Sequence, residues 1–278
     1  MRRDVLELRR FYATPLGRAA REMIGRKVQE GWGDVRALDV LGLGYATPFL
    51  DGLDRARRVV AAMPAAQGVE SWPQGSRNRA CLVDETQLAF PNALFDRILV
   101  VHGLEESIDP LALLREVWRV LAPSGRVMIV AASRLGLWSD AEKTPFGHGR
   151  PFTRAQLEEL VREAELEPLA WSRALYAPPL AWTAGWSEGF ELLGSRLWPP
   201  FSGLILLEAV KQTWAVKPRL SPARARHAAP ALKPVAAGPL FTPQANGAGV
   251  SASLSWRLES AVAGPTNGPA SAIERPDR

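Results

Sequence analysis

The sequence has little of the chemistry that marks disulfide-rich or metal-binding proteins. Its 278 residues include one cysteine and three histidines, so no internal disulfide can form. No spacing typical of metal ligands occurs, and no nucleophile elbow is present. A buried, inert thiol is the simpler interpretation of Cys81, because a catalytic cysteine needs histidine and carboxylate partners that the sequence does not place. We therefore expect neither a metal nor a cysteine nucleophile.

Long apolar runs are also missing. No run of eighteen apolar residues occurs, so we expect no membrane span. The first ten residues, MRRDVLELRR, are charged and lack the apolar segment and cleavage site of a signal peptide. These absences predict a soluble, cytoplasmic protein.

The net charge of +5 is confined to one end of the chain. From Lys217 onward there are 8 basic and 3 acidic residues, whereas residues 1–216 contain 26 of each. Because the part expected to fold is neutral, nucleic-acid binding by it lacks electrostatic support. Residues 217–278 are rich in Pro, Ala and Gly and are expected to form a disordered basic tail.

One strand–helix–strand unit organises the rest. Apolar runs at Arg97–Val101 and Arg126–Ala132 bracket an amphipathic helix from Pro110 to Leu121, which Asp109 can cap. Pro123 to Gly125 are expected to end this helix and turn the chain. This spacing is typical of a parallel sheet with helices on its faces.

Other segments extend this architecture. Further strands are expected at 35–43, 58–63, 79–83, 169–176 and 204–216. Helices are expected at 4–30, with a break at Thr14-Pro15, at 154–164, opened by a capping box of Thr153 and Gln156, and at 180–197, with a tryptophan-rich stripe. The fold class is therefore α/β: a Rossmann-like, seven-stranded, mostly parallel sheet with helices on both faces.

An ordered set of short motifs runs from Cys81 to Val130. They are Asp84, Leu88-Ala89-Phe90, Phe95-Asp96, His102, Leu104-Glu105, Asp109-Pro110 and Leu121-Ala122-Pro123-Ser124-Gly125. In this order and spacing the stretch resembles a class I S-adenosylmethionine-dependent methyltransferase domain of the type 11 kind. Ala89 replaces the family's proline, Glu106 its second histidine and Ser124 its first glycine.

The resemblance implies S-adenosylmethionine as cofactor. Asp39, Gly42 and Gly44 resemble the acid and glycine-rich turn that holds the amino-acid end of that cofactor, since glycines allow close approach of the backbone. One extra residue separates the acid from the first glycine, and Ala46 stands for the last glycine. The resemblance further implies that Asp84 accepts from the adenine amino group and that Glu85 contacts the ring.

The acid that usually binds the ribose is missing. The strand at 58–63 ends in Met63-Pro64, and no acid follows until Glu70. Either backbone and packing by Met63 hold the ribose, or cofactor affinity is reduced. The same absence argues against a nicotinamide-dependent dehydrogenase.

Two histidines are candidate catalytic residues that would act on the methyl acceptor. His102 matches the family's histidine near the transferred methyl, although an isolated histidine at a strand end is often structural. His148 lies in a long loop, 134–151, which is either a lid over the acceptor or a surface loop. Tyr12 either reaches the cofactor or packs at the domain edge, and Glu105 is expected to bond backbone.

The expected organisation is a methyltransferase domain over 1–216 and the tail over 217–278. Within the domain we expect a cover helix at 4–30, a core at 35–133, the lid at 134–151 and a C-terminal part at 152–216. The carboxyl ends of the first four strands should form one cleft.

The predicted activity is methyl transfer to an unidentified acceptor, expected to be a small molecule. The alternative is a non-catalytic cofactor sensor or protein-interaction module, which the altered turn and missing acid favour. Nucleic-acid methylation is a third, weaker possibility. The sequence does not indicate an oligomeric state.

Overall fold

A computed structural model describes residues 2–179 and 202–212. These residues all fall within one compact unit, Met1–Pro218. The helix expected at 180–197 and the tail expected at 217–278 lie outside the described residues.

The centre of the molecule is one seven-stranded sheet in the order β3-β2-β1-β4-β5-β7-β6. The strands are β1 Asp39–Gly44, β2 Arg58–Pro64, β3 Ala80–Val83, β4 Phe95–Val101, β5 Leu121–Ala132, β6 Leu166–Ala174 and β7 Leu204–Lys211. Strands β1 to β5 pair in parallel, and β7 is antiparallel to both β5 and β6. The predicted fold class is confirmed.

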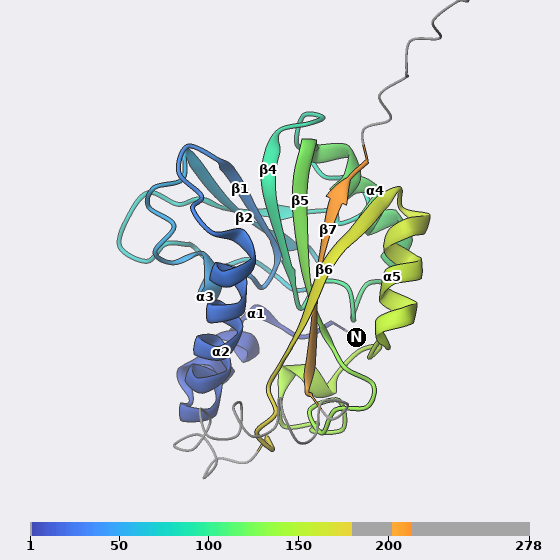
Figure 1. Cartoon of the computed structure of the whole chain (residues 1–278). Helices are drawn as coiled ribbons and strands as arrows, with labels where there is room; N and C mark the ends of the chain where they lie inside the picture. The colour runs from blue at the N-terminus through green and yellow to red at the C-terminus, as the bar shows by residue number, and fades with distance from the viewer. Residues whose placement is uncertain (1, 180–201, 213–278) are drawn as a thin grey trace, which may run out of the picture. The chain divides into compact units, whose positions relative to one another are not determined.

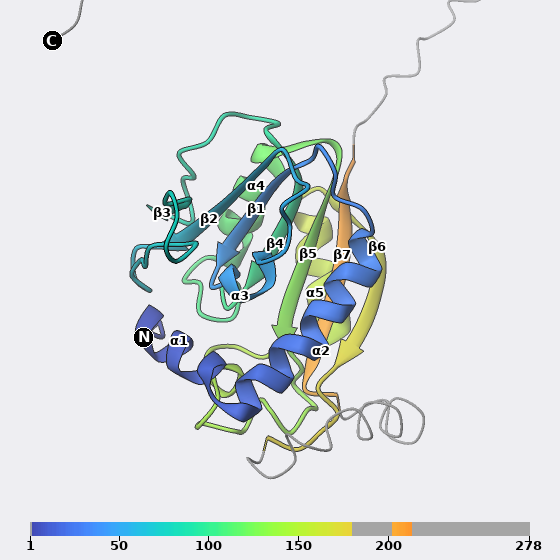
Figure 2. The same cartoon turned by 90° about the vertical axis from the view of Figure 1, so that its left-hand side faces the viewer.

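Helices cover both faces of the sheet (Figures 1 and 2). On one face lie α1 Val5–Ala13, α2 Pro15–Trp32 and the single turn α3 Thr47–Leu50; on the other lie α4 Pro110–Val120 and α5 Arg154–Glu163. A short 3₁₀ turn, η1 Pro145–Gly147, lies in the loop after β5.

Local sequence signals set the helix boundaries. Thr14 separates α1 from α2, and its hydroxyl accepts from the Gly17 N–H at 3.0 Å. Asp109 caps α4 by accepting from Ala112. Thr153 and Gln156 form the predicted capping box of α5. Each cap satisfies backbone N–H groups that have no partner within the helix.

Alternation along the strands divides the core into two layers. Met128 and Val130 of β5 face the layer under α1 and α2, whereas Val127 and Ile129 face α4 and α5. All four side chains are buried. Because successive side chains of a strand point to opposite faces, both faces of a covered parallel sheet need apolar residues.

Several boundaries differ from the predictions, and three of them have a clear structural cause. The first strand begins at Asp39 rather than at residue 35, because Ala37 adopts φ +60° in a turn before it. β5 begins directly after α4 and includes the predicted turn residues, with Ser124 at φ +61°. β6 begins at Leu166, where its pairing with Lys211 extends the strand.

Candidate active site at the carboxyl edge of the sheet

The strand order places a switch point between β1 and β4. From β1 the chain builds β2 and β3 on one side and then returns to add β4 on the other. Sheets of this kind bind ligands outside the carboxyl ends of their strands at such a reversal. Gly44 ends β1, and His102 directly follows β4, so both lie at this point.

Aromatic side chains fill the space above the switch point. The Tyr12 ring stacks on Tyr45 with centroids 5.8 Å apart and meets Phe49 edge-on at 5.7 Å. Phe146, from the loop after β5, lies 4.6 Å from the His102 ring. All five side chains are buried. The structure therefore does not show the open cleft that we predicted, because α1 and this loop close over it.

His102 is held in an unusual backbone conformation and an apolar setting. Its φ is +50°, and its Nε2 lies 2.8 Å from the Tyr12 hydroxyl. Burial lowers the pKa of His102 from 6.5 to about 3. A base with so low a pKa is mostly ineffective near neutral pH, so in this arrangement His102 is a neutral hydrogen-bonding partner of Tyr12.

At Gly42 and Gly44 of the turn, neighbouring atoms of the protein leave no space for a Cβ. Gly44 has φ +86°, and a Cβ there would collide with the Val101 carbonyl, to which the Tyr45 N–H donates at 2.8 Å. A Cβ on Gly42 would lie 2.6 Å from Leu50 Cδ1. Both glycines are therefore required by packing, whatever ligand binds nearby.

Asp39 lies at the other end of β1. Its carboxylate accepts two hydrogen bonds from Arg57, at 2.9 and 2.6 Å, and this pairing lowers the pKa of Asp39. Five residues of strand, about 17 Å, separate it from Gly44. The cofactor role that the resemblance implies for Asp39 finds no support in this position.

Asp84 and Glu85 differ in exposure. The exposed Asp84 accepts from the N–H and the hydroxyl of Thr86, at 2.8 and 2.7 Å, and these bonds lower its pKa. Glu85 instead forms an ion pair with the buried Arg2 at 2.5 Å and accepts from the Ser107 hydroxyl. Their predicted contacts with adenine remain predictions.

The turn after β2 contributes a buried amide. Met63 is fully buried within the core, so it presents no surface to a ligand. Gln67 is 1% exposed, and neither atom of its amide has a hydrogen-bond partner. Glu70, the first acid after β2, accepts from the Tyr45 hydroxyl at 2.9 Å and pairs with Arg9 at 3.3 Å.

Glu105 is a buried carboxyl group at the ends of β4 and β5. One oxygen accepts from the Ala132 N–H at 3.1 Å, and the other, Oε2, has no partner. Burial raises the pKa of Glu105 from 4.5 to about 7. The N–H of Arg150, from the predicted lid, donates to the Glu105 carbonyl at 2.7 Å. Glu105 therefore lies beneath the loop 134–151, and its Oε2 has no hydrogen-bond partner among the described residues.

His148 makes its hydrogen bonds with groups other than this buried carboxyl. Its Nε2 lies 2.7 Å from the Glu142 carbonyl and contacts the Arg3 guanidinium. The Arg3 N–H donates to Glu106 at 2.6 Å. His148 thus connects the loop to the N-terminal segment, and its candidate role at the methyl acceptor remains a prediction.

Several buried polar atoms at this edge have no hydrogen-bond partner among the described residues. Among them are Arg2 Nη1, Gln67 Nε2 and Oε1, and Glu105 Oε2. Buried polar groups are nearly always paired in folded proteins, so such a group points to a missing ligand or water. A guanidinium, an amide and a carboxyl group fit a ligand that carries hydroxyl and amino groups, as S-adenosylmethionine does.

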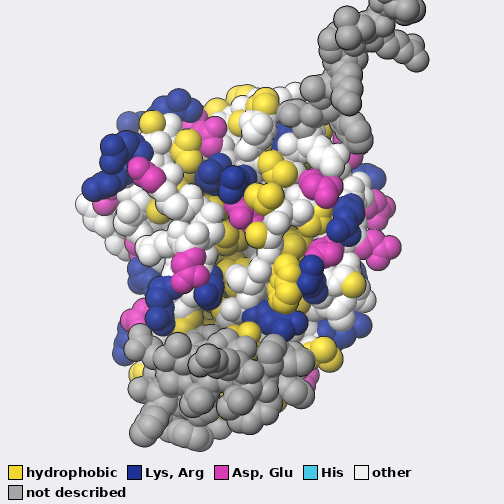
Figure 3. Space-filling view, in the orientation of Figure 1, with side chains coloured by type: hydrophobic (Ala, Val, Ile, Leu, Met, Phe, Trp, Pro, Cys, Tyr) yellow, Lys and Arg dark blue, Asp and Glu magenta, His cyan; other side chains and the backbone are white. Residues whose placement is uncertain are grey.

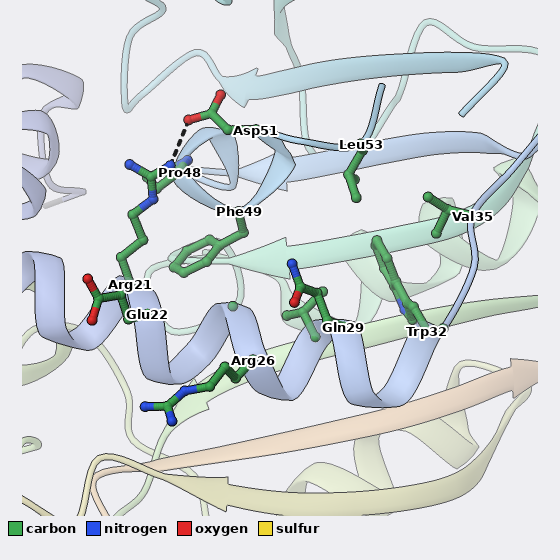
Figure 4. A pocket seen from close by; sticks show the side chains of 13 residues that line it. Arg21, Glu22, Arg26, Gln29, Trp32, Val35, Pro48, Phe49, Asp51 and Leu53 are labelled. Atoms are coloured by element: carbon green, nitrogen blue, oxygen red, sulfur yellow. Dashed lines mark hydrogen bonds and ion pairs between the residues drawn. The ribbon is translucent and has the colours of Figure 1, made fainter. Parts of the chain in front are cut away.

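A cavity of about 440 Å³ lies elsewhere, between α2 and α3 (Figure 4). Phe49, Trp32 and Leu53 provide its apolar wall, and Arg21 of α2 pairs with Asp51 beyond α3 at 2.9 Å. It runs along a face of the sheet rather than at the strand ends, so it does not correspond to the predicted site.

The face of the molecule seen in Figure 3 carries no dominant charge. Basic and acidic side chains alternate over the face seen in Figure 3. Within residues 2–179 and 202–212, no three His, Cys, Asp or Glu side chains gather as metal ligands do. Nor does any helix in that part of the chain have the length and apolarity to cross a membrane.

Comparison with known proteins relates part of this chain to methyltransferases. Residues 38–129 match the family model described as a methyltransferase domain. Ubiquinone/menaquinone biosynthesis C-methyltransferase UbiE of Ralstonia nicotianae is 38% identical over 63 residues, which are 23% of this chain and 25% of that protein. An uncharacterized protein of Mycobacterium tuberculosis is 27% identical over 197 residues, covering 64% of this chain and 63% of its own length. The matches thus span less than two thirds of these relatives.

Solved structures agree in fold. A possible histamine N-methyltransferase of Thermotoga maritima superposes with a TM-score of 0.53 at 17% identity, over 75% of this chain and 96% of that one. The [4+2]-cyclase SpnF gives 0.51 at 21% identity, over 71% and 82%. These likenesses establish the fold, and the second shows that the fold alone does not fix the chemistry.

The fold is that of class I S-adenosylmethionine-dependent methyltransferases. Residues 38–129 match the model of a methyltransferase domain, and the likeness in fold includes an S-adenosylmethionine-dependent methyltransferase.

Two residues of the site, and the partner of Asp39 away from it, were not predicted from the sequence. Arg2 and Gln67 carry no recognisable motif, and only their burial with unpartnered atoms reveals them. Arg57, the partner of Asp39, is one of several adjacent arginines. In the sequence, only the lack of an acid after Met63 indicates that another nearby residue has to replace the acid that usually binds the ribose.

Proposed function

We propose that this protein transfers a methyl group from S-adenosylmethionine to a small-molecule acceptor. The observation that carries the proposal is the set of unpartnered buried polar atoms at the carboxyl edge, within a chain whose residues 38–129 match the methyltransferase family. The sulfonium supplies both the methyl group and its leaving group, so the carbon–sulfur bond breaks as the bond to the acceptor atom forms.

In this proposal the protein orients its ligands and excludes water. Arg2 and Gln67 bind the polar groups of the cofactor, and α1 with the loop 134–151 closes over the acceptor. Tyr12 and Phe146 occupy the space in between, so the two closing segments must separate for entry and return afterwards.

Glu105 is our candidate for the group that takes up the acceptor's proton. Its pKa of about 7 suits a base that works near neutral pH. Its Oε2 is free to accept, while Oε1 is anchored to the backbone of β5. His102, with a pKa of about 3, is a weaker candidate.

A small acceptor is favoured by charge and by space. The neutral balance of residues 1–216 gives no electrostatic support to a nucleic-acid substrate. The acceptor side of the edge is covered by a loop that is fastened through His148 and Arg3, which favours a substrate that the closed loop can enclose.

The test is calorimetric titration with S-adenosylmethionine and S-adenosylhomocysteine, followed by transfer of labelled methyl groups into a fractionated cell extract. We expect binding, and label in the small-molecule fraction. Glu105→Gln should retain cofactor binding and lose most of the transfer, whereas Glu106→Gln, a neighbouring carboxyl bonded to the Arg3 backbone, should retain both.

The aromatic packing above Gly44 favours a second candidate, a non-catalytic cofactor sensor or interaction module. Tyr12, Tyr45 and Phe146 close the edge without a ligand. Cofactor binding without labelled product in any fraction would support the module. Label in nucleic acid would contradict the small-molecule acceptor, and absence of binding would reject both candidates.

A further inference from the structure

In the turn after β2, the side-chain amide of Gln67 forms no hydrogen bond that would support the fold. The backbone of Gln67 is satisfied, because its N–H donates to Pro64 and its carbonyl accepts from the Val5 N–H, both at 2.9 Å. Its side-chain amide is 1% exposed and makes no hydrogen bond through either Nε2 or Oε1. Burial of an amide without partners is unfavourable, so a partner is expected to come from outside the chain.

The surroundings of this turn indicate where that partner lies. The turn follows the carboxyl end of β2, and the Ala65 N–H ties it to Val83 at the end of β3. Arg2, three residues before the Val5 contact, reaches Gly103 after β4 at 3.0 Å and leaves Nη1 unpartnered. Donors and acceptors without partners therefore gather over the ends of neighbouring strands.

In sheets that bind nucleosides, a residue after the second strand commonly bonds the ribose hydroxyls. This chain has no acid there until Glu70, and both oxygens of Glu70 are already engaged by Tyr45 and Arg9. A vicinal diol presents both donors and acceptors, and a carboxamide presents the same pair.

We infer that the Gln67 carboxamide binds the ribose diol of S-adenosylmethionine in place of the missing acid. This inference rests on the proposed function. Gln67 acts here as a positioning residue for the cofactor: it touches the ribose and takes no part in the transfer of the methyl group.

The test measures cofactor binding and stability in the full chain, independently of activity. S-Adenosylhomocysteine and its 2′-deoxy and 3′-deoxy analogues are titrated calorimetrically into the natural protein, Gln67→Met and the control Gln74→Met. Gln74 lies in the same connection, but it is exposed and bonds only Ser71.

We expect the natural protein and Gln74→Met to bind at least one deoxy analogue about tenfold or more weakly than S-adenosylhomocysteine. Gln67→Met should bind S-adenosylhomocysteine about tenfold more weakly and should no longer distinguish the analogues. Without ligand, its melting temperature should equal or exceed that of the natural protein, because an unpartnered buried amide is replaced by an apolar side chain.

Three results would overturn the inference. Unchanged discrimination in Gln67→Met would show that another group binds the diol, while the proposed function stands. A lowered melting temperature in that variant would show that the amide supports the fold. No binding of S-adenosylhomocysteine by the natural protein would reject the proposed function together with this inference.

Discussion

The Tyr12 hydroxyl and the His102 Nε2 lie 2.8 Å apart in a buried aromatic cluster. This bond joins the N-terminal helix to the end of β4, 90 residues further along the chain. Phe146, from the loop after β5, covers the other side of the imidazole at 4.6 Å. Three segments distant in sequence therefore close the carboxyl edge of the sheet through one histidine.

Tyr12→Phe should destabilise the closed edge. The substitution leaves a buried imidazole nitrogen without a partner, which costs about 1–3 kcal/mol. Urea unfolding measures the change. Tyr45→Phe, which removes a bond to the partly buried Glu70 that still pairs with Arg9, is the matched control and should cost less. Equal stability of Tyr12→Phe and the natural protein would show that the bond to His102 is not formed in solution.

Glu105→Gln should alter how stability depends on pH. Burial raises the pKa of Glu105 from 4.5 to about 7, so the native state keeps a proton that the unfolded state releases. The stabilisation is full below pH 4.5 and is lost as the pH rises through about 7. The difference between the natural protein and Glu105→Gln should change by at most about 3 kcal/mol across this range.

Urea unfolding at a series of pH values measures this difference. His102, whose pKa is lowered from 6.5 to about 3, has the opposite dependence: its stabilisation is present above pH 6.5 and is lost as the pH falls toward 3. Because both proteins contain His102, its contribution cancels in the comparison. A difference that stays constant with pH would show that Glu105 titrates normally.

Asp39→Asn should weaken the fold and leave cofactor binding unchanged. The carboxylate is buried, pairs with Arg57 and lies at the start of β1, about 17 Å of strand away from Gly44. Thermal unfolding and titration with S-adenosylhomocysteine separate the two effects, and Arg57→Met should lower the melting temperature in the same way. A loss of affinity at unchanged stability would support the role in cofactor binding that the resemblance implies.

Asp84→Ala should weaken S-adenosylhomocysteine binding by about tenfold with little effect on stability. The resemblance implies that this carboxylate accepts from adenine, and within the protein it bonds only its neighbour Thr86. Calorimetric titration measures the affinity, with Asp54→Ala, another exposed acid, as control. Full affinity in Asp84→Ala would mean that its carboxylate only shapes the turn.

The sequence by itself determined the elements and their order. Caps at Thr14, Asp109 and Thr153 and the apolar periodicity of Pro110–Val120 predicted the helices, because these signals act between residues one or two helical turns apart. The spacing of strand, helix and strand predicted the parallel sheet, and the motifs from Asp84 to Gly125 carried the resemblance to a methyltransferase domain.

Only the tertiary structure decided what occupies the carboxyl edge. Asp39 lies three residues before Gly42 in the sequence, and successive side chains of a strand point to opposite faces. This local spacing does not reveal that Arg57 is the partner of Asp39. Tyr12 contacts His102 after β4, and Arg2 pairs with Glu85 after β3. These contacts join the N-terminal segment to strand ends far away in the chain, and they leave the Gln67 amide after β2 without a partner. Such contacts depend on how crossovers bring distant segments together, and no local pattern of residues encodes them.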